Sequence, residues 1–195
     1  MAIMGQSGSG KSTFLQVASM LSEPSKGQIF LKGKNVTDYD EVDRAKLRNR
    51  EIGFVFQQFN LLPKTSALEN VALPLIYAGV PEQERKQKAQ EMLKRVGLGE
   101  RLHNHPNQLS GGQQQRVAIA RALVNEPSII FADEPTGNLG TKSGGEIRRI
   151  LQDLHKQGKT ILMVTHEEEL GEAAQRIVCL EDGRVIEDSG PCFAN

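Results

Sequence analysis

The chain has 195 residues, which is long enough for one sizeable α/β core and too short for two ordinary domains. Lysine plus arginine and aspartate plus glutamate number 24 each, so the net charge gives no indication of long-range attraction to nucleic acid or anionic lipid. No apolar run approaches the roughly 18 residues of a membrane-spanning helix, so we expect no direct insertion into a membrane. Two cysteines without a Cys-x-x-Cys pattern indicate a reduced protein; we expect Cys179 in the core and Cys192 at the surface.

The first motif in the chain is GQSGSGKST at residues 5–13. The apolar residues 2–4 precede it and the amphipathic residues 13–21 follow it, so the pattern predicts a strand, a phosphate-binding loop and a helix. Glycines let successive backbone N–H groups face one concavity, and the helix N-terminus adds partial positive charge. Lys11 then suits the β- and γ-phosphates, and the Ser12 hydroxyl suits Mg²⁺. A flexible Gly/Ser linker, the alternative, would leave the flanking strand and helix unexplained.

Strands and helices are expected to alternate through the rest of the chain, apart from a helical middle. Pro74 is expected to bend or shorten the first helix of that middle, which opens with the capping-box spacing of Ser66 and Glu69. The expected strands are 28–32, 52–56, 129–132, 160–165 and a terminal hairpin over 176–187; the expected helices are 40–50, 66 onward, 81–97, 111–125, 142–157 and 167–174. Ile147, Ile150, Leu151 and Leu154 form an apolar stripe expected to face the sheet.

This order of elements predicts a single α/β domain with a parallel-sheet core. The core is expected to comprise about residues 1–59 and 128–195, with a helical subdomain at about residues 60–127.

A second motif is the apolar run 129–132 followed by Asp133 and Glu134. A buried strand that ends in two carboxylates delivers them to the edge at which α/β sheets bind ligands. Successive side chains of a strand point to opposite sides, so the two acids need not share one role. Asp133 suits the Mg²⁺ shell and Glu134 suits polarising an attacking water. An ordinary strand that ends in a charged turn is the alternative interpretation.

A third motif, LSGGQ at residues 109–113, leads into a helix. Ser110 is a favourable N-cap, and the two glycines expose N–H groups at a helix start, which predicts a second anion site. A plain helix cap is the alternative. One triphosphate rarely needs two phosphate cradles in one chain, so we expect this one to complete the site of another copy.

Over essentially its whole length, the chain resembles the ATP-binding subunit of an ABC transporter. The motifs follow that family's order: the phosphate loop, Gln57 after a strand, LSGGQ at 109–113, the carboxylate pair 133–134 and His166 after a strand. Residues 132–139 resemble the branch that serves lipoprotein-release, macrolide-efflux and peptide-export permeases. The resemblance implies a P-loop NTPase (RecA-like) parallel-sheet core with a helical insertion specific to ABC proteins.

The resemblance also implies ATP and Mg²⁺ as cofactors and a role for each matching residue. Glu134 would be the general base, His166 would contact the γ-phosphate and hold Glu134 and the water in place, and Gln57 would sense the γ-phosphate or Mg²⁺. Together with Lys11 these are the catalytic residues. The nucleotide-binding residues implied are Gly5, Gln6, Ser7, Gly8, Ser9, Gly10, Lys11, Ser12, Thr13, Ser110, Gly111, Gly112 and Gln113. Ser12, Gln57 and Asp133 are implied as the Mg²⁺ ligands. His103, His105 and His155 match no motif and are expected at the surface.

Two departures from the family pattern affect these expectations. Gly140 stands where this branch has an aspartate that lines the subunit interface. The family also carries antiparallel strands and an adenine-stacking aromatic before the phosphate loop, and these strands are largely missing here. We expect the chain to be N-terminally truncated, to bind ATP weakly by itself and to expose an apolar sheet edge.

The function expected from this resemblance is an ATPase subunit that powers a membrane permease from the cytoplasmic face of the cell membrane. Two such subunits, as a homodimer or pseudo-dimer, would sandwich two ATP molecules. The alternative is a regulatory ATPase whose ATP-dependent dimerisation controls a membrane partner without moving cargo. An ABC ATPase acting on DNA or ribosomes would need a long insertion or a second cassette, and a small-molecule kinase would leave LSGGQ unexplained.

Overall fold

The computed structural model describes residues 1–189, which form two compact units. The first unit comprises Met1–Arg48 and the chain from Leu162 onward; the second is Asn49–Ile161. The expected exposure of Cys192 concerns a residue outside the described part of the chain. Among the described residues, no helix is both long and apolar enough to cross a membrane.

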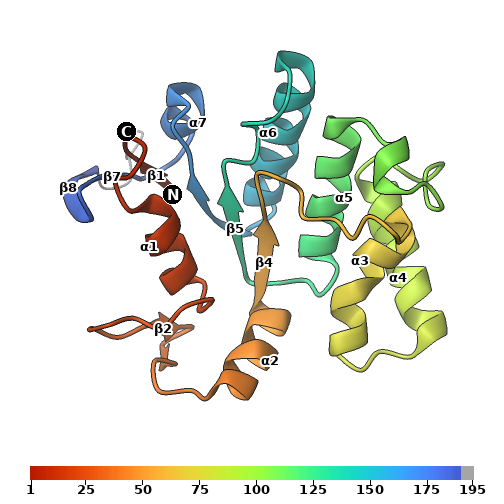
Figure 1. Ribbon diagram of the computed structural model, residues 1–195, viewed down its shortest axis with the longest axis horizontal. Coiled ribbons are helices and arrows are strands. Elements are labelled where there is room, and N and C mark those ends of the chain that lie inside the picture. The colour runs from red at the N-terminus through yellow and green to blue at the C-terminus, as the bar shows by residue number, and fades with distance from the viewer. Residues whose placement is uncertain (190–195) are drawn as a thin grey trace. The chain divides into compact units, whose positions relative to one another are not determined.

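The first unit is built on parallel strands. β1 (Ala2–Met4) lies between β6 (Thr160–Val164) and β7 (Ile177–Glu181), parallel to both, and β8 (Arg184–Ser189) runs antiparallel to β7 (Figure 1). Asp182 and Gly183 both have positive φ, as a tight hairpin turn between β7 and β8 requires, which confirms the predicted hairpin.

The helices of the first unit are α1 (Lys11–Ala18) and α7 (Glu168–Glu172), and α2 (Glu41–Glu51) leads the chain into the second unit. The predicted helix 13–21 was wrong in its bounds, because the helix begins at Lys11 inside the glycine-rich loop. It ends at Ala18, shortly before buried Met20 takes a positive φ of 60° that a helix cannot continue through.

A small antiparallel ribbon joins β2 (Phe30–Leu31) to β3 (Lys34–Asn35). The prediction of a half-buried strand at 28–32 was therefore too long. Lys32 and Gly33 adopt positive φ, which turns the chain directly after Leu31. Phe30 is exposed, so the apolar side chain that suggested burial faces solvent.

The second unit pairs two parallel strands with a set of helices. β4 (Ile52–Val55) pairs with β5 (Ile129–Asp133). The helices are α3 (Ala67–Tyr77), α4 (Glu82–Arg95), the short 3-10 helix η1 (Pro106–Gln108), α5 (Gly111–Leu123) and α6 (Thr141–Lys156). α5 is largely buried and lies directly against β4, since a Cβ at Gly53 would overlap the Ala122 carbonyl oxygen. Glycine at this position therefore permits the close approach of helix and strand.

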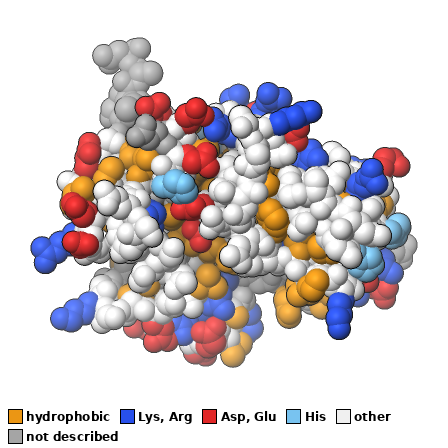
Figure 2. Space-filling view, turned by 45° about the horizontal axis from the view of Figure 1, so that its top comes forward, with side chains coloured by type: hydrophobic (Ala, Val, Ile, Leu, Met, Phe, Trp, Pro, Cys, Tyr) orange, Lys and Arg blue, Asp and Glu red, His pale blue; other side chains and the backbone are white. Residues whose placement is uncertain are grey.

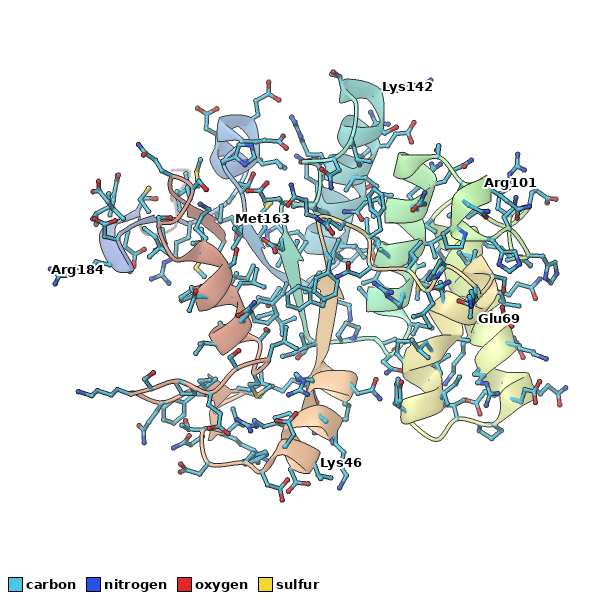
Figure 3. All side chains as sticks on the ribbon, in the orientation of Figure 1. Lys46, Glu69, Arg101, Lys142, Met163 and Arg184 are labelled. Atoms are coloured by element: carbon cyan, nitrogen blue, oxygen red, sulfur yellow. The ribbon has the colours of Figure 1, made fainter. Side chains whose placement is uncertain are left out.

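The capping box predicted for α3 is confirmed. The Ser66 hydroxyl accepts the Glu69 N–H at 3.2 Å, and the Glu69 carboxylate accepts the Ser66 N–H at 2.7 Å. The Ser66 N–H, as the main cause, holds the pKa of Glu69 below its ordinary value. Glu69 is labelled in Figure 3 beside the start of α3. Pro74 lies inside this helix, which continues to Tyr77, so the helix does not end at Pro74, and the alternative that Pro74 bends it stays a prediction.

Two burial predictions need correction. Ile147 and Leu151 of the α6 stripe are buried, whereas Ile150 and Leu154 are half-buried. Ile150 and Leu154 line a groove of about 510 Å³ together with residues of α4 and α5. The apolar stripe of α6 is therefore wider than the part of the helix surface that is buried. Cys179 is half-buried, because its neighbours Val178 and Leu180 take the inward positions of β7.

The expected helical subdomain, residues 60–127, belongs wholly to the second unit, which also contains β4, β5 and α6. The boundaries predicted for that subdomain stay a prediction. Figure 2 shows acidic and basic side chains interspersed on the face that it displays, in keeping with the balanced charge of the sequence.

Candidate nucleotide and catalytic sites

The loop between β1 and α1 has the backbone expected of an anion cradle. Gly5, Gly8 and Gly10 have φ of 154°, 84° and 96°, a range that side-chain-bearing residues rarely adopt. A Cβ at Gly5 would overlap the Leu180 carbonyl oxygen, so only glycine fits where β1 enters the loop. Gly10 is the N-cap of α1 and supplies no side-chain cap, so the first N–H groups of the helix stay available to an anion.

Lys11 is the cation of this loop. Its ammonium group donates to the carbonyl oxygens of Gly5 and Gln6 at 2.7 Å each and to the Ser9 hydroxyl at 3.5 Å. The side chain is buried, while Ser7, Gly8, Ser12 and Thr13 of the same loop are exposed. The loop therefore fixes a positive charge at its centre and presents an accessible polar rim, which suits a polyphosphate.

In the second unit, the residues that follow β4 and β5 meet. The Gln57 side-chain amide donates to the Glu134 carboxylate at 3.2 Å, and the Asn138 side chain donates to the Gln57 carbonyl oxygen at 3.0 Å. Both parallel strands deliver these residues at their carboxyl ends, the edge predicted from the sequence. Both Gln57 and Glu134 are half-buried, so a carboxylate oriented by an amide remains accessible to a small ligand such as water.

Gly137 lies beside the Gln57–Glu134 contact, where a larger residue would crowd both side chains. A Cβ there would lie 2.9 Å from the Gln57 side-chain nitrogen and 3.2 Å from the Glu134 carboxylate. The Gly137 N–H also donates to the Glu134 carbonyl oxygen at 3.1 Å and closes a turn in which Glu134 has a positive φ of 41°. Glu134 thus lies past the end of β5, in a turn, and its direction does not follow from the alternation of side chains along the strand.

The LSGGQ segment starts α5 as predicted, with Ser110 as the N-cap. The Ser110 hydroxyl accepts the Gln113 N–H at 3.3 Å, and the Gln113 side-chain oxygen accepts the Ser110 N–H at 2.9 Å. This reciprocal cap was missed from the sequence, although the Ser-x-x-Gln spacing indicates it. Ser110 is exposed. Gly112 is buried, and a Cβ there would lie 2.8 Å from the Ser143 side chain of α6, so glycine permits this close approach.

Gln115 is the residue of this region that sequence reasoning missed. Its side chain is fully buried, and its amide nitrogen donates to the Pro135 carbonyl oxygen at 2.6 Å and to that of Phe56 at 3.4 Å. A glutamine within a polar QQQ run reads as solvated, and only the pairing of β4 with β5 places these carbonyls beside it.

The predicted catalytic residues are divided between the two units. Lys11 and His166 belong to the first unit; Gln57 and Glu134 belong to the second, where they are in contact. His166 is exposed at the end of β6, as its predicted role requires. His103, His105 and His155 are also exposed, as expected of residues without a motif.

The predicted Mg²⁺ ligands fit that ion by their chemistry. Ser12, Gln57 and Asp133 offer a hydroxyl, an amide and a carboxylate, all oxygen donors. No cluster of three or more His, Cys, Asp or Glu in residues 1–189 could hold a metal by itself. Mg²⁺ usually takes one or two carboxylates and completes its shell with water and substrate phosphates, so a sparse ligand set is what a nucleotide-bound ion requires.

Gly140 is the N-cap of α6 and has a φ of −67°. A Cβ there would meet nothing within 4 Å. The aspartate found at this position in the branch that residues 132–139 resemble would therefore fit without strain. Glycine at this position is therefore not imposed by the local fold.

Comparison with known proteins gives consistent matches over nearly the whole chain. A family model described as "ABC transporter" matches residues 1–137. An uncharacterized ABC transporter ATP-binding protein of Thermotoga maritima is 57% identical over 195 residues, which cover 99% of this chain and 83% of that protein. The macrolide export ATP-binding/permease protein MacB of Bdellovibrio bacteriovorus is 54% identical over 187 residues; the match covers 96% of this chain and 28% of that protein.

Solved structures agree with these matches. The ATP-binding cassette MJ0796, in a dimeric post-hydrolysis state bound to ADP and Pi, superposes with a TM-score of 0.87 at 48% identity, over 97% of this chain and 84% of that one. The protein cbiO1 of Clostridium perfringens, part of the transporter complex cbiONQ, superposes with a TM-score of 0.86 at 34% identity, over 97% of this chain and 76% of that one.

Proposed function

This chain belongs to the ABC transporter family, and from that premise we propose how its residues divide the work of ATP hydrolysis. Its fold is the P-loop fold of ATP-binding cassettes, with a parallel-sheet core. It is an ATP-binding subunit that hydrolyses ATP, uses Mg²⁺ and drives a transporter together with transmembrane subunits. The residue roles, the pairing of copies in the reaction and the position at the membrane are our proposals.

In the proposed site, the loop of residues 5–13 holds the triphosphate. Its N–H groups bind phosphate oxygens, and the Lys11 ammonium exchanges its contacts with the Gly5 and Gln6 carbonyls for the β- and γ-phosphates. Ser12, Gln57 and Asp133 hold Mg²⁺. When bound, that ion neutralises charge that develops on the phosphate oxygens.

Glu134 is the proposed general base for the attacking water. Its contact with Gln57 is the single observation that carries this assignment, because the amide donor orients the half-buried Glu134 carboxylate at the carboxyl end of the paired strands. Gln57 reports the state of the phosphate through the same contact. His166 holds the water and the γ-phosphate in line, which is a positioning task that an exposed imidazole can perform.

The exposed start of α5 completes the site of a second copy. Ser110, Gly111 and Gly112 offer a capped helix N-terminus, which binds anions, while residues 5–13 already provide a cradle for the chain's own triphosphate. The dimeric form of the related cassette MJ0796, with ADP and Pi, supports this arrangement. ATP would close two copies, and hydrolysis would release them.

At the membrane, we propose that the subunit lies on the cytoplasmic face and drives cargo movement through a permease. The related MacB proteins, of which this chain covers about a quarter to a third, join an ATP-binding part to a permease in one chain. A regulatory subunit that controls a membrane partner without moving cargo would use the same dimerisation.

Transport by reconstituted vesicles separates these two functions. The subunit, its cognate permease and ATP-Mg²⁺ are combined in vesicles, and the accumulation or release of candidate cargo is measured against time. Transport is expected to stop when Glu134→Gln replaces the wild-type subunit, because the cycle cannot reopen without hydrolysis. Normal ATP turnover with no cargo moved in any direction would favour the regulatory function.

A further inference from the structure

We propose that Gln115 is a positioning residue that couples the start of α5 to the catalytic pair Gln57 and Glu134 of the same subunit. The proposal rests on the function proposed above and concerns the regulation of that site. When the partner's nucleotide binds at Ser110 or leaves it, Gln115 changes the position of the Glu134 carboxylate, which acts on the subunit's own nucleotide.

The Gln115 amide lies between two backbone carbonyl groups. Its nitrogen donates to the Pro135 carbonyl oxygen at 2.6 Å and to the Phe56 carbonyl oxygen at 3.4 Å. Pro135 directly follows Glu134, and Phe56 directly precedes Gln57. Carbonyl oxygens only accept hydrogen bonds, so the orientation of the amide is fixed by its two partners. One buried side chain therefore links the backbone on either side of the Gln57–Glu134 contact.

Burial of Gln115 leaves one polar atom of its side chain unsatisfied within residues 1–189. Gln115 is fully buried, and its side-chain oxygen has no hydrogen-bond partner among the described residues. A buried acceptor without a partner destabilises a fold, whereas an apolar side chain of similar size would fill the same space without that penalty. Packing alone thus gives no reason for a glutamine at this position, whereas its hydrogen bonds to the carbonyl oxygens of Phe56 and Pro135 do.

A continuous helix connects Gln115 to Ser110. Gln115 lies five residues after Ser110 in a single uninterrupted helix whose first turn is fixed by the Ser110–Gln113 cap. Near its other end, Arg121 donates to the carbonyl oxygens of Phe59 and Asn60, in the segment that follows Gln57. When nucleotide contact at Ser110 shifts α5, the shift therefore moves the backbone beside Gln57 and beside Glu134.

The closest alternative route is the contact of α5 with α6. Arg116 pairs with Glu146 at 3.2 Å, and Gly112 lies against Ser143. That contact holds the helices together without touching Gln57 or Glu134. Its disruption should loosen α5 and leave the geometry of the catalytic pair in place.

The test compares three variants in steady-state ATP hydrolysis at varied ATP. Gln115→Met keeps the length of the side chain and removes its donor. Gln115→Glu can donate to Pro135 only when its carboxyl is protonated. Gln87→Met, on the exposed face of α4, makes the same chemical change away from the site and is the matched control. The readouts are kcat, KM, the Hill coefficient for ATP and the thermal unfolding midpoint.

Gln115→Met is expected to lower kcat by about 5- to 100-fold and to bring the Hill coefficient toward about 1, with KM little changed. For Gln115→Glu, the kcat relative to wild type is expected to rise as the pH falls from about 8.5 to about 6, because two carbonyl oxygens favour the protonated carboxyl. Gln87→Met is expected to match wild type in every readout.

If Gln115 has a purely structural role, its variants should have lower unfolding midpoints, an unchanged Hill coefficient and a kcat relative to wild type that does not vary with pH. That result would overturn the proposal. Should Gln115→Met fail to fold, the pH ratio of Gln115→Glu decides alone. Glu134→Gln, measured in parallel, distinguishes a failure of the coupling through Gln115 from a failure of the proposed function. If it is inactive while the Gln115 variants behave as wild type, the coupling is wrong and the proposed function stands. If it turns over normally, the proposed function itself fails.

Discussion

Replacing Glu134 with glutamine is expected to lower the steady-state rate of ATP hydrolysis by about 10²- to 10⁴-fold. The substitution keeps the size of the side chain and its capacity to contact Gln57, and it removes the oxygen that takes a proton from the attacking water. The affinity for ATP is expected to change little, because Glu134 is assigned no part in binding the triphosphate. Phosphate release, followed at saturating ATP-Mg²⁺, measures the rate.

Glu91→Gln is the matched control for this prediction. Glu91 is an exposed carboxylate on α4 that accepts from Gln87, so the same change there should leave the rate at the wild-type level. A rate for Glu134→Gln within a few-fold of wild type would remove Glu134 from the role of base.

The second large effect is expected from Lys11→Met, which should weaken ATP binding by about 10- to 100-fold. The variant retains the aliphatic stem and loses the charge that the loop holds at its centre through Gly5 and Gln6. Binding is measured with a fluorescent ATP analogue and competed with unlabelled ATP. Circular dichroism establishes that the loop carbonyls left without a donor do not unfold the chain.

Lys46→Met serves as the control for the loss of a lysine charge. Lys46 projects into solvent from α2 in the same unit (Figure 3), with 72% of its side chain exposed. Its substitution should leave the ATP affinity unchanged. Equal affinities of Lys11→Met and wild type would mean that the loop binds its anion through backbone groups alone.

Local chemistry explains why so much of the fold could be predicted from the sequence. The Ser66–Glu69 cap, the Asp182–Gly183 turn and the glycines of residues 5–13 each depend on residues close in sequence. Their geometry follows from backbone sterics and short-range hydrogen bonds. The family match then confirmed the function that the phosphate loop and the LSGGQ segment indicated.

Predictions failed where neighbours distant in sequence decide the outcome. Pro74 was expected to bend or shorten its helix. The helix is not cut short at Pro74 but continues to Tyr77, and the Pro74 carbonyl oxygen accepts from the side chain of Asn125 at 3.4 Å. Tertiary packing of α3 can outweigh the local penalty of proline. The half-burial of Cys179 likewise depends on which face of β7 is covered, which an apolar run does not specify.

In the catalytic region, too, sequence motifs identified single residues, whereas contacts between residues distant in sequence could not be predicted. Glu134 and Gln57 were identified by motif, but they lie 77 positions apart in the sequence, so their contact could not be predicted from it. Gln115 could not be found from the sequence, because a polar run in an amphipathic helix normally faces solvent and the carbonyls of Phe56 and Pro135 become its partners only when β4 pairs with β5.

The mass of the Glu134→Gln variant in solution, measured by sedimentation with and without saturating ATP-Mg²⁺, probes most directly whether two copies complete each other's sites. We expect the mass of a single chain without nucleotide and twice that mass with ATP-Mg²⁺, reverting to a single chain when Ser110 is also changed to arginine. A single-chain mass at every ATP concentration, with ATP demonstrably bound, would contradict the account.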